Sequence, residues 1–285
     1  MRWSSGDRGN IDDQRAAGGF GVVPLGIGGF IVVALLSMFT GIDFFSMLGG
    51  RGAPPTQSVG TSGQVNATPT EEKLVDFVDA VAGDVQETWQ RVLGSRYERT
   101  KVVLFRDQIQ SACGFAQSAT GPFYCTSDHK VYLDLGFFDE LQRRFGAPGD
   151  FAQAYVLAHE FGHHIQALTG TESQMRQAQR SDPGAANALS VRLELQADCY
   201  AGVWGHSAAQ PGRAAQGKVE LESGDAEEGL RAAAAIGDDR LQKMATGRVM
   251  PERFTHGSSQ QRVSWFTRGF ESGDARACDT FSSTR

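Results

Sequence analysis

The longest apolar stretch of the chain lies close to its start. No residue from Ala16 to Ile42 carries a charge, and Phe30–Leu36 consists of apolar residues only. A run of this length can cross a bilayer as a helix, in which glycines and Pro24 are tolerated. The pattern therefore predicts one transmembrane helix within residues 18–48. The alternative is a cleaved signal peptide, but the run is longer than a usual signal-peptide core and no clear small-x-small site follows it.

The charges around this run predict its orientation. Three arginines precede it, and only Arg51 follows closely. By the positive-inside rule, residues 1–17 would form a cytoplasmic tail and the remainder of the chain would lie outside the membrane. Residues 49–70 are rich in glycine, proline, serine and threonine, which indicates a flexible linker. The three arginines are Arg2, Arg8 and Arg15.

Residues 71–285 carry mainly helical patterns. Thr68, Pro69 and Glu71 offer an N-cap, a first-turn proline and a capping glutamate, and apolar residues at helical spacing follow. The sequence therefore predicts a mainly α domain with a small β-sheet. The other expected helices span 137–145, run from a cap at Asp150 toward Gly170, span 187–206, and follow capping boxes at Asp225–Glu228 and Ser258–Gln261. The expected strands are Lys101–Phe105 and Val131–Leu135.

Composition excludes one class of function. The net charge of the 285 residues is −6. A mildly acidic domain lacks the basic patch that nucleic-acid-binding proteins present, so no nucleic-acid partner is expected.

The four cysteines fit an exported domain. An even number of cysteines outside the cytoplasm suggests disulfides, and four cysteines allow three pairings. Cys113 and Cys125 are close in sequence and are favoured as one pair, which leaves Cys199 and Cys278 as the other. Four reduced, buried thiols are the alternative. A cysteine-based zinc site is disfavoured because the chain has no CxxC spacing.

The segment Ala158–His163 contains the motif HExxH. Residues four apart share one face of a helix, so His159 and His163 can present their imidazoles to one metal ion. Glu160 points toward the same side, where it can take a proton from a metal-activated water and pass it to a leaving amine. The uncharged neighbours fit a buried active-site helix. The alternative is a core helix with two hydrogen-bonded histidines.

A zinc site of this kind needs a third protein ligand and an open position for water. Glu194 and Asp198 lie four residues apart on a later predicted helix, and both can face the metal. Two buried carboxylates need positive partners, which a metal ion and a histidine N–H provide. Glu194 is the expected third ligand, and Asp198 is expected to orient a metal-binding histidine. The reverse assignment is also open.

HEFGHH followed by ELQADCYAGVW resembles the bacterial neutral zinc metallopeptidase family, which is distantly similar to the gluzincin peptidases with HExxH and ExxxD. Other stretches, among them NIDDQR and HGSSQQR, extend the resemblance over nearly the whole chain except the linker. The resemblance implies an α+β, zincin-like fold and an exported, membrane-anchored peptidase without a known substrate. By position, it implies that His159, His163 and Glu194 bind Zn²⁺ and that Glu160 is the catalytic base.

Several other residues are candidates for the same site. His256 precedes the last predicted helix and could donate to the oxyanion, or it could lie in a surface loop. Arg262 could pair with a carboxylate such as Asp198. His164 is expected to be a surface residue or to support a ligand, and His129 and His206 are expected at the surface. Tyr132 lies on a strand that could pair with substrate backbone, although a place in the sheet core is favoured.

These observations predict a zinc peptidase, anchored in the cell membrane by a single helix and facing outward, that hydrolyses peptide or protein substrates. One alternative is a non-catalytic, zinc-stabilised envelope protein that serves binding or assembly. It is disfavoured because structural zinc sites usually have four protein ligands, and only three good ones besides Glu160 are found. A third possibility is an enzyme that acts on non-protein amides such as cell-wall peptides, which the sequence does not separate from proteolysis.

Overall fold

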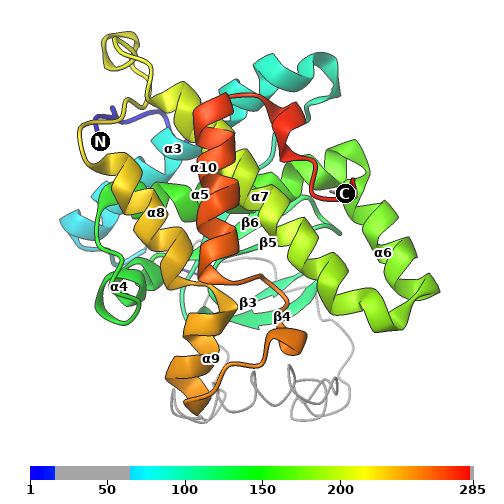
Figure 1. Cartoon of the computed structure of the whole chain (residues 1–285). Helices are drawn as coiled ribbons and strands as arrows, with labels where there is room; N and C mark the ends of the chain where they lie inside the picture. Colours follow the sequence, from blue (N-terminus) through cyan, green and yellow to red (C-terminus); the bar gives the residue numbers. More distant parts are fainter. Residues whose placement is uncertain (17–64, 283–285) are drawn as a thin grey trace.

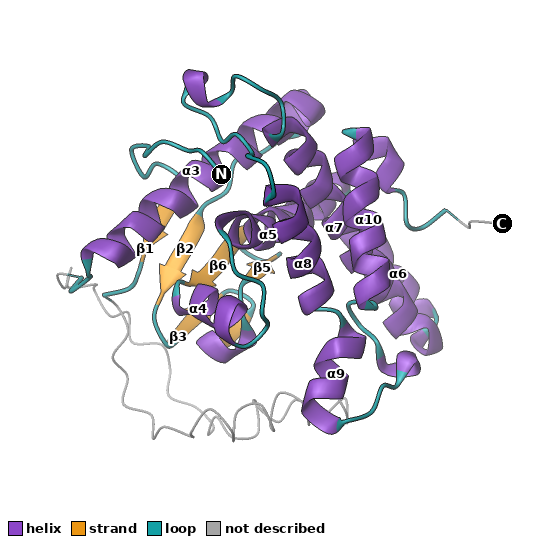
Figure 2. Cartoon of the chain, turned by 60° about the vertical axis from the view of Figure 1, so that its left-hand side comes forward, coloured by secondary structure: helices purple, strands orange, loops and turns teal. Residues whose placement is uncertain are grey.

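The computed structural model describes residues 1–16 and 65–282 (Figure 1). These residues are mainly helical, with a small sheet on one side of the helices, as the sequence predicts (Figure 2). The predicted transmembrane helix, residues 18–48, and most of the predicted linker lie outside the described residues. Within the described ranges, no helix is long and apolar enough to cross a membrane.

The helices expected from the sequence all form, with small shifts at their ends. Two further helices, α6 and α9, were not expected. The described α-helices are α3 (Pro69–Leu93), α4 (Gly136–Arg143), α5 (Asp150–Thr169), α6 (Thr171–Ser181), α7 (Ala186–Ala208), α8 (Asp225–Ala235), α9 (Asp238–Thr246) and α10 (Ser259–Ser272).

Two of the predicted helix caps are present. Thr68 accepts a hydrogen bond from the Glu71 N–H at the start of α3. Ser258 and Gln261 form a complete capping box at the start of α10. The N-cap threonine, the first-turn proline and the Ser258–Gln261 box therefore act as the sequence predicts, whereas the Glu71 carboxylate pairs with Arg15 and Arg106 and does not cap the helix.

Two other cap predictions are wrong. Asp225 is the first residue of α8 rather than its cap, because Gly224 at φ 97° occupies the cap position. The Asp225 carboxylate instead accepts from the Glu222 N–H. Asp150 likewise begins α5 directly after Gly149, which supplies no side-chain cap. In both places a glycine with positive φ turns the chain into the helix, and the acidic residue follows it.

The main sheet has four strands in the order β1-β2-β6-β5. Strand β2 pairs in parallel with both β1 and β6, and β5 pairs with β6 in antiparallel. Both strands predicted from the sequence, which become β2 and β6, are therefore internal. The strands are β1 (Ile11–Asp13), β2 (Val102–Phe105), β5 (Phe123–Cys125) and β6 (Lys130–Asp134), and a separate hairpin contains β3 (Gln108–Ser111) and β4 (Gly114–Gln117).

Tyr132 belongs to the sheet core. It lies on β6 between two paired strands, is buried, and stacks on Phe123 with ring centroids 4.8 Å apart. Its strand has no free edge for a substrate backbone. The edge strand next to β6 is β5.

Residues 1–16 differ from the expected separate tail over residues 1–17. Strand β1 pairs with β2, and the backbone of Arg2 exchanges two hydrogen bonds with Glu220. This segment therefore contacts residues of the predicted domain 71–285 and is not separate from it in the structure. The local sequence does not predict these contacts, because the segment is polar and its stabilising partners lie about 56 to 218 residues away.

Both predicted disulfides are present. Cys113–Cys125 ties the β3–β4 hairpin to strand β5, with Cα atoms 5.7 Å apart. Cys199–Cys278 ties helix α7 to the C-terminal segment, with Cα atoms 5.5 Å apart. The chain has no free cysteine.

Helix α5 lies at the centre of the helical body and packs closely on α7. A Cβ added at Gly162 would lie 2.9 Å from the Cα of Ala197 on α7. The interface between α7 and α10 is closer still, since a Cβ at Gly269 on α10 would lie 1.9 Å from the carbonyl oxygen of Cys199 on α7. Glycine at these positions lets the backbones approach, and this approach brings α5 and α7 together at the site.

Candidate metal centre

Helix α5 presents the two HExxH histidines on one face. The rings of His159 and His163 lie 4.9 Å apart, centroid to centroid. His159 is buried, and His163 is partly buried at the wall of a cavity. The four-residue spacing thus places both imidazoles at one point, as predicted.

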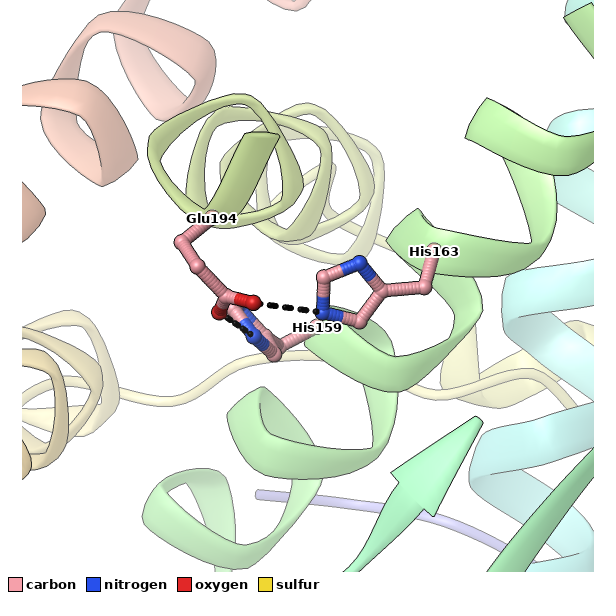
Figure 3. Close-up of side chains that lie close together, drawn as sticks. All are labelled: His159, His163 and Glu194. Atoms are coloured by element: carbon pink, nitrogen blue, oxygen red, sulfur yellow. Dashed lines mark hydrogen bonds and ion pairs between the residues drawn. The ribbon is translucent and has the colours of Figure 1, made fainter. Parts of the chain in front are cut away.

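Glu194 reaches this point from α7. Its Oε2 atom lies 3.1 Å from His159 Nε2, and its Oε1 atom lies 3.5 Å from His163 Nε2. Figure 3 shows the carboxylate facing both rings. One donor atom from each of the three residues lies within 4.8 Å of the others.

An oxygen atom at Nδ1 orients each imidazole ring. His159 Nδ1 lies 2.9 Å from Asp198 Oδ1, and His163 Nδ1 lies 2.9 Å from Gln166 Oε1. An oxygen acceptor at Nδ1 favours the tautomer that keeps the proton there and leaves Nε2 free as a ligand. Two imidazole nitrogens and one carboxylate are a usual donor set of catalytic zinc, so these residues fit Zn²⁺.

The pKa values of the same residues indicate that the site favours a positive charge. Burial disfavours the protonated form of His163, but Glu194, Glu160 and Gln166 together outweigh burial and raise the pKa of His163 to about 10. Burial also disfavours ionised Glu194, yet His163 and His256 hold the pKa of Glu194 well below its ordinary value. A carboxylate that stays ionised between two imidazoles suits a divalent metal ion.

Asp198 is the centre of a buried network behind His159. Arg262 donates to both of its oxygens over 2.8 Å, and the Tyr155 hydroxyl donates to Oδ1. Burial opposes ionisation, but Arg262 and His159 outweigh it and lower the pKa of Asp198 to about 2. Asp198 therefore contacts a candidate ligand from behind, while Glu194 is part of the candidate donor set. The expected pairing of Arg262 with Asp198 is present.

Tyr155 was not a candidate in the sequence. It lies four residues before His159 on α5 and is fully buried. The i, i+4 spacing was the available signal, because it puts Tyr155 and His159 on the same face. A tyrosine in an otherwise apolar helix is, however, compatible with any core position.

Glu160 differs from the other acidic residues of the site. Its side chain is 7% exposed, lines the cavity and has no hydrogen-bond partner among the described residues. Burial raises the pKa of Glu160 above its ordinary value, although His163 and His159 oppose this. The carboxylate is open to the cavity beside the donor set, and an ionisable group in a cavity with a raised pKa is a candidate catalytic group.

His256 lies in the loop before α10 and lines the same cavity. Its Nδ1 lies 3.0 Å from Thr255 Oγ1 and 3.3 Å from Asp238 Oδ1. Burial disfavours the protonated form, but Glu194 and Asp238 outweigh it and raise the pKa of His256. Its Nε2 has no hydrogen-bond partner in the described part of the chain and is available to a ligand.

Asp238 holds this loop in place and was not a candidate in the sequence. Its Oδ2 atom accepts from the backbone N–H groups of Thr255, His256 and Gly257 over 2.7, 2.7 and 3.1 Å. No local pattern reveals a contact that spans 17 to 19 residues.

The remaining histidines lie outside the donor set. His164 is buried rather than at the surface, with Nε2 2.7 Å from the Glu98 carbonyl and Nδ1 3.0 Å from the Tyr124 hydroxyl. This pair links α5 to strand β5. His129 is exposed, as predicted, and contacts the same hydroxyl. His206 is partly buried and contacts the Phe270 carbonyl.

The cavity in front of the donor set has a volume of about 550 Å³. Its walls come from β5, α4, α5, α6, α7, the α8–α9 region and the His256 loop. Apolar and charged side chains both line it. Examples are Phe137, Phe145 and Leu241 on the apolar side and Glu140, Arg144 and Arg176 on the charged side.

Comparison with known proteins agrees with this geometry. The model of a family described as "Putative neutral zinc metallopeptidase" matches residues 1–281. The chain belongs to this family. The family resemblance stated from the sequence is therefore confirmed, and the family's name implies zinc as the metal of the donor set.

Similar proteins occur in Escherichia coli and Mycobacterium tuberculosis. The "Uncharacterized protein YpfJ" of Escherichia coli (strain K12) is 45% identical over 295 residues, with 99% of each chain covered. The "Uncharacterized protein Rv2575" of Mycobacterium tuberculosis (strain ATCC 25618 / H37Rv) is 46% identical over 209 residues, which cover 72% of this chain and 70% of the relative. No solved structure matches the chain significantly.

Proposed function

We propose that this protein is a zinc-dependent peptidase that hydrolyses peptide bonds in peptide or protein substrates. His159, His163 and Glu194 would hold the ion. Bound zinc would supply Lewis-acid chemistry, polarising the scissile carbonyl and making water acidic enough to react near neutral pH. The observation that carries the proposal is Glu160, whose carboxylate faces the cavity next to the donor set and has no hydrogen-bond partner in the described part of the chain.

Glu160 is the general base in this proposal. It accepts a proton from the water that attacks the carbonyl and delivers a proton to the leaving amine. Its raised pKa suits both directions of proton transfer, because an ordinary carboxylate is too weak a base near neutral pH. Tyr155, Asp198 and Arg262 hold His159 from behind and take no part in proton transfer.

His256 is the proposed donor to the oxyanion. The Asp238 carboxylate orients the ring through Nδ1, and three backbone N–H groups fix the loop on the same carboxylate. The free Nε2–H can then donate to the carbonyl oxygen as negative charge develops on it. Strand β5 lines the cavity at the end of the sheet, where an extended substrate could pair with it.

The proposed location is the extracytoplasmic face of the cell membrane. Two disulfides in a chain without a free cysteine fit an oxidising compartment. The apolar residues 18–48 remain the proposed membrane attachment.

The alternative of a non-catalytic zinc-stabilised protein would need a closed site. Structural zinc usually has four protein ligands, whereas the cluster of His159, His163 and Glu194 has three and opens into a cavity. The open side favours catalysis.

The proposal is tested by peptide cleavage with the purified full chain. A mixed peptide library should be cleaved by the zinc-loaded protein, not by the chelated protein, and again after one equivalent of zinc is restored. Mass spectrometry of the products reports the cleaved bonds. Equal cleavage before and after verified zinc removal would contradict a zinc-dependent peptidase.

A further inference from the structure

Strand β1 is held in the sheet by backbone pairing. Its three residues align in parallel with Val102, Val103 and Leu104 of β2. The ladder extends at both ends, since Val102 N–H donates to the Asn10 carbonyl over 2.9 Å and Gln14 N–H donates to the Leu104 carbonyl over 2.8 Å. A strand that detached would expose this edge of β2.

Arg15 is buried at the end of this strand. It is 3% exposed and forms ion pairs of 2.7 to 2.9 Å with Asp13, Glu71 and Glu72. The last two belong to the first turn of α3. A buried guanidinium needs such partners, so Arg15 fits this place in the domain and not an unstructured tail.

The other two N-terminal arginines are also paired with the domain. Arg8 binds Glu72 and Asp76 over 2.6 and 2.7 Å. Arg2 pairs with Glu220, a buried residue more than 200 positions away. All three arginines that suggested a cytoplasmic tail therefore have carboxylate partners in the peptidase domain.

Helix α3 carries polar residues that match this segment. Asp79 is 2% exposed and accepts from the N–H groups of Arg8 and Asn10 and from the Asn10 side chain, over 2.9 to 3.1 Å. Gln86, also buried, donates to the Asn10 side chain over 2.8 Å. The buried face of α3 is thus complementary to residues 8–10.

We propose that residues 1–16 are a structural part of the peptidase domain, so that they and residues 65–282 lie on the same side of any membrane that residues 18–48 enter. A single helical crossing between them would put the two parts on opposite sides and would separate every pair described above. If the domain faces outward, its N-terminal strand does so too, and Arg2, Arg8 and Arg15 do not mark a cytoplasmic tail.

This inference concerns the path of the chain and does not depend on catalysis. A pair of engineered cysteines tests it directly. Arg2 and Glu220 exchange two backbone hydrogen bonds, and residues paired in this way have Cα atoms about 5.5 Å apart, within the range of a disulfide. Arg2→Cys combined with Glu220→Cys should cross-link, since the native cysteines are already paired.

The matched control combines Arg2→Cys with Lys243→Cys on α9, which lies at the opposite end of the domain from the N-terminus (Figure 1). Membranes from cells that express either variant are oxidised and mapped by non-reducing peptide mass spectrometry. A 2–220 link in most molecules and no 2–243 link is the expected result. Absence of the 2–220 link in folded, membrane-bound protein would overturn the inference.

Labelling of single cysteines tests the same point without a cross-link. Ser4→Cys and Lys243→Cys both place a thiol at an exposed position. A membrane-impermeant maleimide applied to spheroplasts should label both or neither. Labelling of both also supports the outward-facing domain, and labelling of neither places both parts inside. Labelling of Lys243→Cys alone, with Ser4→Cys reacting only after permeabilisation, would overturn the inference.

Discussion

The Asp198 carboxylate contacts His159 through one oxygen and Arg262 through the other. Oδ1 lies 2.9 Å from His159 Nδ1, and Oδ2 accepts from Arg262 Nε over 2.8 Å. The carboxylate therefore connects a candidate ligand on α5 to a cation on α10. This contact favours the tautomer that has its proton on Nδ1 and leaves Nε2 of His159 free as a ligand. It is the reason for the proposal that Asp198 orients His159 and is not itself a metal ligand.

Replacing this carboxylate should weaken zinc binding without removing a ligand. Asp198→Asn keeps the size of the side chain but removes its charge, so His159 becomes a poorer ligand. We expect zinc affinity to fall about 10- to 100-fold, as is usual for loss of such a partner. Competition with a fluorescent chelator measures it. An exposed aspartate on α4, changed in Asp139→Asn, is the control, and equal affinities in both variants would refute this role.

Removing Arg262 should destabilise the fold itself. The side chain is 2% exposed, and Arg262→Met leaves Asp198 buried without its main positive partner. Breaking a buried pair in this way typically costs about 3–5 kcal/mol. Urea unfolding of the zinc-free protein measures the loss. Arg143→Met, at a site 80% exposed, should change stability by less than about 0.5 kcal/mol. A similar small change for Arg262→Met would show that the network adds little.

Zinc should stabilise the protein through Glu194. Ligands that bind only the folded state raise its unfolding temperature, and a preformed site gives a concentration-dependent shift. Zinc should therefore raise the melting temperature of the wild type but not of Glu194→Ala. Calorimetry with and without a chelator measures both. The donor-set assignment fails if the two proteins respond alike.

The ion pairs of the N-terminal strand predict a pH dependence. Hydrogen bonds from Arg15 lower the pKa of Asp13 from 3.8, and hydrogen bonds from Arg8 and Arg15 lower the pKa of Glu72 from 4.5. Lowered carboxyl pKa values contribute stability that is present above the unfolded values and is lost as pH falls through the folded ones.

Arg15→Ala should therefore be less stable than the wild type at pH 7, and the difference should shrink as pH falls below about 4. Urea unfolding at several pH values gives the two curves. A difference that stays constant from pH 7 to pH 3 would contradict an electrostatic origin.

Local spacing predicted much of the site but little of its support. The i, i+4 pairs His159–His163 and Glu194–Asp198 lie on single helices, so their faces follow from the sequence. The distance between α5 and α7 does not follow from the sequence of either helix. It depends on Gly162 meeting Ala197, a packing contact that no pattern within either helix encodes.

The same reasoning explains what the sequence did not reveal. The Asp238 contacts with the His256 loop and the pairing of β1 with β2 join residues far apart in the chain. Strand β1 is only three residues long and largely polar, so it lacks the alternation that identifies a strand. Its place in the sheet follows from backbone pairing with β2 and from ion pairs of Arg8 and Arg15 with carboxylates of α3, and these contacts exist only in the folded chain.

The most direct test of the central claim is the activity of Glu160→Gln. This change keeps size and hydrogen-bonding ability but removes the proton acceptor. The account predicts normal folding, one zinc per chain by elemental analysis, and kcat for a cleaved library peptide reduced roughly 10²–10⁴-fold, the usual contribution of acid–base catalysis. Glu140→Gln, which alters another glutamate of the same cavity, should retain kcat within a few-fold. A zinc-loaded Glu160→Gln protein with the kcat of the wild type would contradict the account.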